Sequence, residues 1–144
     1  MKRLIMVMGP PGSGKSTYVR HHKQEEDAHF EADMFFMEDG EYKFNRERLK
    51  EAHEWCQEKT ERAMINGVEN IYVSNTFIKA WERKTYLDLA RNYGYIVHFV
   101  RMNTMYNNIH NVPDSVVINM VANIQEVSEK ELYGLPGIVF EEVK

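Results

Sequence analysis

The chain has little cysteine and no long apolar run, and both shortages limit where it can work. Cys56 is the single cysteine, so no internal disulfide can form, and a reducing compartment is expected. No segment approaches the roughly 18 apolar residues of a membrane span. The five apolar residues after Arg3 are too few for a signal sequence. We therefore expect a cytoplasmic protein.

The chain also lacks a basic excess. Its 144 residues carry a formal net charge of −4, which argues against an open surface that coats nucleic acid without specificity. A local basic cleft remains compatible with this charge. The length, the 43% hydrophobic content and the absence of repeats or long linkers predict a single domain over residues 1–144.

Short apolar runs alternate with helical patterns along the whole chain. Strands are expected over residues 3–9, 28–33, 70–77, 95–102 and 137–143, and helices over 15–23, 46–66, 79–94 and 112–127. Asn45 is the expected N-cap of the second helix and Gly67 its stop signal. Such alternation predicts βαβ units. The expected fold is a three-layer α/β/α of the P-loop NTPase type, with a mostly parallel sheet of four or five strands.

A phosphate-binding loop is the strongest motif. The pattern G-x-x-x-x-G-K-[ST] is matched between the first strand and the first helix, which is the required context, by Gly9, Pro10, Pro11, Gly12, Ser13, Gly14, Lys15 and Ser16. Glycines allow backbone N–H groups to surround a phosphate, and the helix N-terminus favours its charge. Lys15 is expected to reach the β- and γ-phosphates and Ser16 to bind Mg²⁺. Thr17 is either a helix residue or an α-phosphate contact.

A phosphate-binding loop does not by itself show whether the γ-phosphate is transferred to water or to a substrate. The N-K-x-D element of guanine-specific GTPases is absent, and a small kinase needs a base near the acceptor hydroxyl. Asp33 closes the expected second strand, and ligands bind beyond the carboxyl ends of such strands, so Asp33 is a candidate base. A loop acid that caps a turn is the alternative. Glu31 alternates to the other face of that strand and is not expected to act.

Two phenylalanines follow Asp33. Phe35 and Phe36 could belong to the core, or they could form an aromatic floor for a base or a sugar. We count both with the candidate substrate-binding residues.

Four segments together resemble the polynucleotide-kinase-type P-loop kinases over nearly the whole chain: "GPPGSGKSTYVR", "EADMFF" with "EDGEYKFN", "VSNTFIKAWER" and "NIHNVP". The resemblance extends to phage polynucleotide 5′-hydroxyl kinases, phage kinases of 5-hydroxymethyluracil in DNA, and eukaryotic kinase-like domains of ubiquitin-ligase-binding proteins. It implies ATP and Mg²⁺ as cofactors, phosphate and metal roles for Lys15 and Ser16, and Asp33 as general base. A phage source would place the protein in the host cytoplasm.

The chain departs from this family at three places. Phe36 stands where an arginine contacts the acceptor-side phosphate. The third-strand acid is replaced by Ser74, Asn75 and Thr76, of which Asn75 and Thr76 are candidate substrate contacts. The lid arginine is replaced around Asn107. Candidates for the missing charge are Arg101, expected just after the fourth strand, and Lys79 and Arg83, which we expect to form a basic groove with it. A solvated surface charge is the alternative for each.

The sequence therefore predicts an ATP-dependent kinase that phosphorylates a hydroxyl on nucleic acid. Two acceptors fit: the hydroxymethyl group of 5-hydroxymethyluracil in DNA, which the missing arginine favours, and a polynucleotide 5′-hydroxyl end. A small-molecule kinase for a nucleoside or sugar, and a nucleotide-binding adaptor whose catalysis has decayed, remain alternatives.

Overall fold

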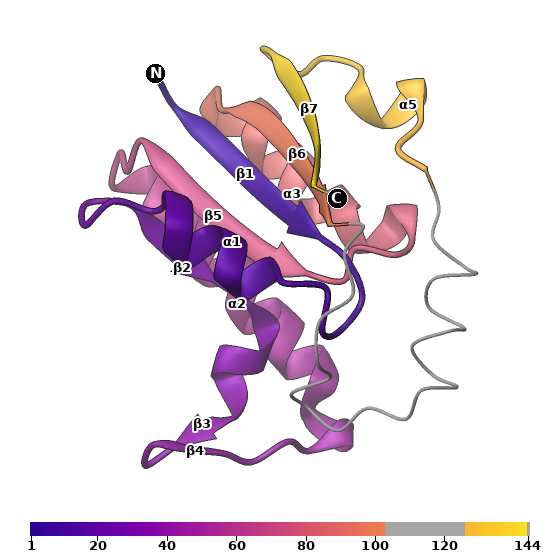
Figure 1. The fold of residues 1–144 in the computed structure, drawn as a ribbon. Coiled ribbons are helices and arrows are strands. Elements are labelled where there is room, and N and C mark those ends of the chain that lie inside the picture. Colours follow the sequence, from indigo (N-terminus) through magenta and orange to yellow (C-terminus); the bar gives the residue numbers. More distant parts are fainter. Residues whose placement is uncertain (103–125, 144) are drawn as a thin grey trace.

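Parallel strands form the centre of the fold (Figure 1). The structure is a computed structural model, and it describes residues 1–102 and 126–143. The five-stranded sheet has the order β2 (Ala28–Phe30), β5 (Asn70–Asn75), β1 (Arg3–Met8), β6 (Ile96–Met102) and β7 (Ile138–Val143). Every pairing between neighbouring strands of this sheet is parallel. All five strands therefore end at the same edge, where α/β folds bind their ligands.

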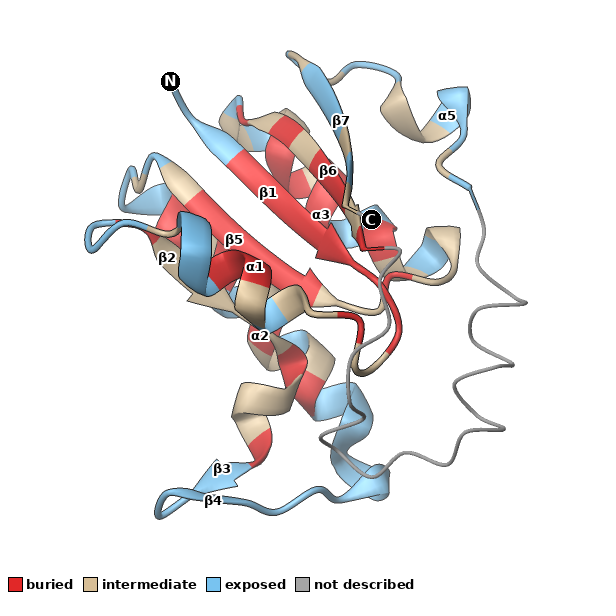
Figure 2. Cartoon of the chain, viewed as in Figure 1, coloured by how far each residue is buried: buried red, intermediate tan, exposed pale blue. Residues whose placement is uncertain are grey.

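Helices cover both faces of this sheet. The α1 helix (Lys15–His22) lies on one face, and α2 (Leu49–Ile65) and α3 (Ala80–Tyr93) lie on the other. Alternate β1 residues explain the division, since Leu4 and Met6 pack with α2 and α3 while Ile5 and Val7 pack with α1. These β1 side chains are buried (Figure 2). The predicted three-layer α/β fold is confirmed.

The second helical region begins and ends close to its predicted signals. Asn45 Oδ1 accepts a hydrogen bond from the backbone N–H of Glu47 at 3.0 Å, as an N-cap does. The first turn is a 3₁₀ segment, η2 (Arg46–Arg48), and α2 follows it. Gly67 has the left-handed φ of 76° expected of a C-terminal stop. A short helix that the sequence analysis missed, α5 (Glu129–Leu132), precedes β7.

The second strand ends earlier than expected. The sequence analysis extends it to Asp33, but β2 stops at Phe30 and Asp33 lies in a 3₁₀ helix, η1 (Ala32–Phe36). The Ala32 N–H donates to the side-chain oxygen of Asn75 at 2.9 Å instead of continuing the sheet. A small antiparallel hairpin, β3 (Met37–Glu38) and β4 (Glu41–Tyr42), follows η1.

Other boundaries differ by a few residues. The third strand was expected to reach Phe77, but β5 ends at Asn75 and Phe77 adopts a left-handed φ of 50°. Arg101 lies inside β6 rather than after it. The helix expected over 112–127 and the position around Asn107 lie outside the described residues, except for 126 and 127. Within the described ranges, no helix combines the length and the apolar character needed to cross a membrane.

Candidate active site

The phosphate-binding loop connects the end of β1 to the start of α1. Gly12 and Gly14 have φ values of 80° and 92°, a region that side chains with a Cβ rarely adopt. A Cβ at Gly9 would lie only 2.5 Å from Ser13 Oγ. Ser13 Oγ is buried, and the described residues give it no hydrogen-bond partner. The loop therefore has the curvature that brings its backbone N–H groups around an anion.

Lys15 folds back over this loop. Its Nζ donates to the carbonyl oxygens of Gly9 at 2.8 Å and Pro10 at 3.0 Å. Burial lowers the pKa of Lys15 to about 8, and the negative charges of Glu31 and Asp33 oppose that decrease. The lysine is thus held beside the loop and within electrostatic range of both carboxylates.

Asp33 is fixed by two neighbouring segments. Tyr42, from the β3–β4 hairpin, donates its hydroxyl proton to Asp33 Oδ1 at 3.0 Å. The bond from Ala32 to Asn75 ties the start of η1 to the end of β5. Although Asp33 is not at a strand end, its half-buried carboxylate still acts on Lys15, whose pKa it tends to raise.

Glu31 does not lie where strand alternation predicted, because its side chain contacts Ser16 at the start of α1. Because β2 ends at Phe30, alternation along the strand no longer decides where Glu31 points. Its Oε2 accepts hydrogen bonds from Ser74 Oγ at 2.7 Å and from Ser16 Oγ at 3.4 Å. Glu31 therefore contacts the predicted metal ligand.

An open groove of about 630 Å³ lies beside η1, on the side of the hairpin and the start of α2. Its lining combines aromatic and basic side chains: Phe35, Phe36, Met37, Glu38, Lys43, Phe44, Asn45, Arg46 and Arg48. Figure 2 shows that the hairpin and the segment after it are exposed. Three basic groups against one acid give the lining a positive balance on a chain of charge −4.

The aromatic residues of the groove have different roles in packing. Phe36 is only 4% exposed and contacts Phe35, Tyr42 and Phe44 edge to face. Phe35 is half-buried, and the Arg48 guanidinium lies 4.7 Å from its ring centre. Phe44, which the sequence analysis missed, is 51% exposed and also stacks with Tyr42. Phe36 is thus a core residue that supports the wall, and Phe35 and Phe44 form its accessible part.

Two of the predicted substrate residues have internal partners. Asn75 accepts from Ala32 N–H and places its amide 3.8 Å from Cys56 Sγ, so it joins β5 to η1 and α2. Thr76 Oγ1 donates to Glu82 Oε1 at 3.0 Å. The backbone N–H of Lys79 donates to Glu82 Oε2 at 2.9 Å, which caps α3. Asn75 and Thr76 therefore position neighbouring segments.

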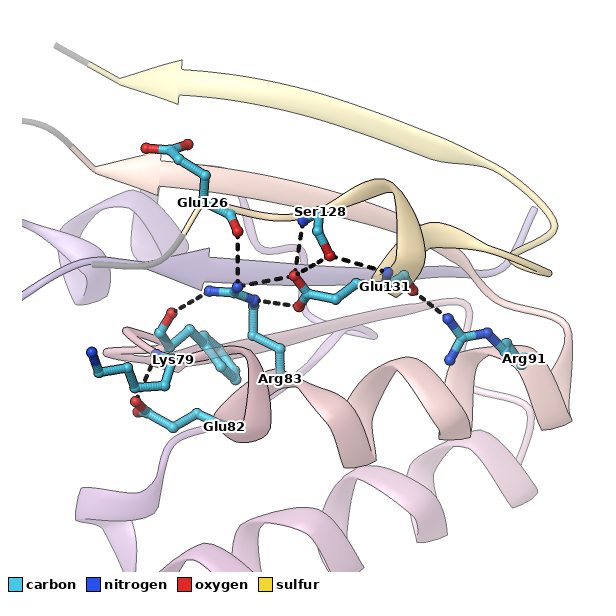
Figure 3. A network of polar contacts seen from close by, with 8 residues as sticks. Lys79, Glu82, Arg83, Arg91, Glu126, Ser128 and Glu131 are labelled. Atoms are coloured by element: carbon cyan, nitrogen blue, oxygen red, sulfur yellow. Dashed lines mark hydrogen bonds and ion pairs between the residues drawn. The ribbon is translucent and has the colours of Figure 1, made fainter. Parts of the chain in front are cut away.

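Arg83 was expected to contribute to an open basic groove, but it does not. It is 1% exposed, and its guanidinium donates to both carboxylate oxygens of Glu131, at 2.8 and 3.1 Å (Figure 3). It also donates to the carbonyl oxygens of Phe77 at 2.8 Å and Glu126 at 3.4 Å. Burial tends to raise the pKa of Glu131, but hydrogen bonds from Arg83 and Ser128 outweigh it and lower that pKa. Arg83 thus connects α3 to the segment before β7 and holds the strained Phe77 backbone.

Arg101 lies beside the end of β1, because it is paired with Met8 in the sheet. With Gly9, Thr76, Arg83 and Glu126, it contributes to a small cavity of about 30 Å³. Its Nη1 donates to Glu126 Oε1 at 2.5 Å, and its side chain is 39% exposed. Arg101 and Arg83 therefore share one cavity, but only Arg101 is accessible from outside.

The comparisons with known proteins agree with this geometry. A family model described as "AAA domain" matches residues 4–109. The chain belongs to this family. It is also 31% identical over 133 residues to human NEDD4-binding protein 2, across 85% of this chain and 8% of that protein. The chain thus spans a small part of that relative's length.

Several solved structures share the fold of this chain. A Pnkp1 RNA repair complex with Rnl and Hen1 gives a TM-score of 0.67 at 16% identity, over 86% of this chain and 44% of that chain. A sugar kinase from Janibacter sp. gives 0.62 at 20% identity, over 99% and 86%. Chaetomium thermophilum Kti12 with ADP-AlF3 gives 0.62 at 14% identity, over 95% and 87%. At these identities, the similarity concerns the fold alone.

Proposed function

We propose that this chain is an ATP- and Mg²⁺-dependent kinase that phosphorylates a hydroxyl group on nucleic acid. The observation that carries the proposal is the position of Asp33. It belongs to η1, the segment that also supplies Phe35 and Phe36 to the groove wall. It accepts a hydrogen bond from Tyr42, and its negative charge tends to raise the pKa of Lys15. A base between a phosphate loop and an acceptor groove is the arrangement that phosphoryl transfer needs.

The phosphate side would use the loop and two side chains. The backbone N–H groups of the loop and the Lys15 ammonium would bind the β- and γ-phosphates. Phosphate oxygens would replace the Gly9 and Pro10 carbonyls as acceptors for Lys15. Ser16 would hold Mg²⁺, which neutralises charge on the phosphates. The hydroxyl and carboxylate oxygens of Ser16 and Glu31 fit this ion, because Mg²⁺ prefers hard oxygen ligands.

On the acceptor side, Asp33 would take the proton of the attacking hydroxyl. The hydroxyl oxygen forms a bond to the γ-phosphorus, while the bond from that phosphorus to the bridging oxygen breaks and its electron pair leaves with ADP. Tyr42 keeps the carboxylate in place through its hydrogen bond. Arg101, beside Gly9, would stabilise charge that develops on the transferred group.

The composition of the groove favours a nucleotide-containing acceptor. Phe35 and Phe44 can stack on a base, and Lys43 and Arg46 can contact backbone phosphates. The resemblance to polynucleotide kinases is consistent with this, and Pnkp1 belongs to an RNA repair complex. Two acceptors follow, a 5-hydroxymethyluracil base in DNA and a 5′-hydroxyl end. The structural similarity to a sugar kinase supports a small-molecule acceptor as the second candidate.

Transfer of label from γ-³²P-ATP would test the proposal. Three acceptor sets are needed: a 5′-hydroxyl oligonucleotide, an oligonucleotide with blocked ends that contains 5-hydroxymethyluracil, and a panel of nucleosides and sugars. We expect label in one of the two oligonucleotides and none with the Lys15→Ala variant. Label in the nucleosides or sugars alone would establish the second candidate. ATP binding without transfer to any acceptor would support a decayed adaptor.

A further inference from the structure

Glu31 belongs to a polar cluster built from three parts of the fold. Its Oε2 accepts from Ser16 Oγ on α1 and from Ser74 Oγ on β5. On β2, His29 Nε2 lies 2.7 Å from Ser74 Oγ and 3.7 Å from Glu31 Oε2. The carboxylate is therefore held against the predicted metal ligand by neighbours on both sides.

The place of Glu31 in the sheet explains why an acid is useful there. P-loop enzymes hold Mg²⁺ with the loop Ser or Thr and an aspartate from a nearby strand. The strand beside β1 is β5, and its end carries Ser74, Asn75 and Thr76, none of which is acidic. Phe30 is paired with Val73 in the adjacent strand, so Glu31 follows β2 next to Ser74. Glu31 thus follows β2, which lies one strand further from β1 than β5 does. Its side chain contacts Ser74 on β5 as well as Ser16.

We infer that Glu31 is the carboxylate that holds or orients Mg²⁺ together with Ser16, and that Ser74 positions it. This inference rests on the proposed function. Within the described ranges, no group of three or more His, Cys, Asp or Glu side chains could hold a metal ion. Mg²⁺ does not need such a group, since it is usually bound by one or two carboxylates, waters and substrate phosphates. The Glu31 side chain is 22% exposed, so it can take a further ligand.

Glu31 and Asp33 would have different roles in the reaction. Glu31 contacts Ser16 on the phosphate side, whereas Asp33, two residues later, contacts Tyr42 on the side of the groove. Ala32, the first residue of η1, lies between the two acids in the sequence. Glu31 would therefore affect metal binding, and Asp33 would affect proton transfer.

Binding of Mn²⁺ in the presence of ADP, followed by electron paramagnetic resonance, measures this without catalysis. We expect Glu31→Gln to weaken Mn²⁺ binding by about 10- to 100-fold and to leave ADP binding in EDTA unchanged. Asp33→Asn is the matched control and should bind Mn²⁺ as the unmodified protein does. The double variant Glu31→Ser with Ser74→Asp should recover most of the affinity that Glu31→Ser loses, because it returns a carboxylate to the adjacent strand.

The possible results separate the inference from the proposed function. Unchanged Mn²⁺ affinity in Glu31→Gln would overturn the inference, as would equal losses of ADP binding with and without metal, since Glu31 would then be structural. Failure of the unmodified protein to bind Mn²⁺ with ADP would instead refute the proposed kinase function.

Discussion

The phosphate side and the acceptor side of the candidate site are built in different ways. The main part of the phosphate side is one continuous segment, residues 9–16, which joins the buried β1 strand to the start of α1. The acceptor side combines η1, an exposed hairpin and the segment before α2, with aromatic and charged side chains that face a groove. Under the proposed function, the first region would supply the chemistry common to P-loop proteins and the second would supply the choice of acceptor.

The largest effect is expected at Lys15, on the phosphate side. We expect Lys15→Ala to reduce phosphoryl transfer by about 10³-fold or more, because it removes the ammonium group that would neutralise the negative charge of the transferred phosphoryl group. The fold should survive, since Lys15 is a partly desolvated cation whose removal relieves a burial cost. Steady-state rates, with circular dichroism as the control for folding, would check this. Near-normal turnover would contradict the assignment of Lys15 and its loop to phosphate binding.

The next effect belongs to the acceptor side. Asp33→Asn should lower the single-turnover rate at saturating ATP by about 10²- to 10⁴-fold, because an amide cannot accept the proton. ATP affinity should stay nearly constant, and a nucleotide titration would measure it. A parallel loss of ATP affinity would show that Asp33 contributes to nucleotide binding, and the two regions would then not be separate in function.

The Arg83–Glu131 ion pair is expected to stabilise the fold that holds both regions. Arg83→Met should cost about 3–5 kcal/mol in the free energy of unfolding, because it leaves the Glu131 carboxylate, 13% exposed, without its partner. Denaturant melts would measure the loss, and Arg83→Met with Glu131→Leu should recover much of it.

The same pair predicts a pH dependence. The pKa of Glu131 is lower in the folded protein than its ordinary value of 4.5. Its contribution to stability is therefore present above pH 4.5 and lost as the pH falls through the folded pKa. An acid melt that is identical in the unmodified protein and the double variant would contradict this.

A smaller effect is expected at the groove. Phe44→Ala should weaken acceptor binding by about 1–3 kcal/mol, the usual value for one base stacked on an aromatic side chain. The effect should appear in the KM for the acceptor and not in the KM for ATP. Tyr133→Ala is a suitable control, because Tyr133 is also exposed but belongs to the segment before β7. Equal KM values for Phe44→Ala and the unmodified enzyme would exclude the groove as the acceptor site.

The sequence by itself determined the features that depend on neighbours along the chain. Alternating strands and helices gave the α/β layers. The phosphate-binding loop could be identified because its glycines, lysine and serine are contiguous, and the Asn45 cap and Gly67 stop because their backbone demands are local. Asp33 was expected at the end of a strand, whereas the structure has it in η1.

Tertiary structure alone decided which polar groups meet. Glu31 reaches Ser16 because β2 ends at Phe30, and that end depends on a bond to Asn75, 43 residues away from Ala32. Arg83 is internal because Glu131, 48 residues later, folds against it. Phe44 joins the groove through the hairpin that precedes it. Contacts between distant segments depend on where each strand stops and on which partner satisfies a buried donor, and local sequence patterns carry neither.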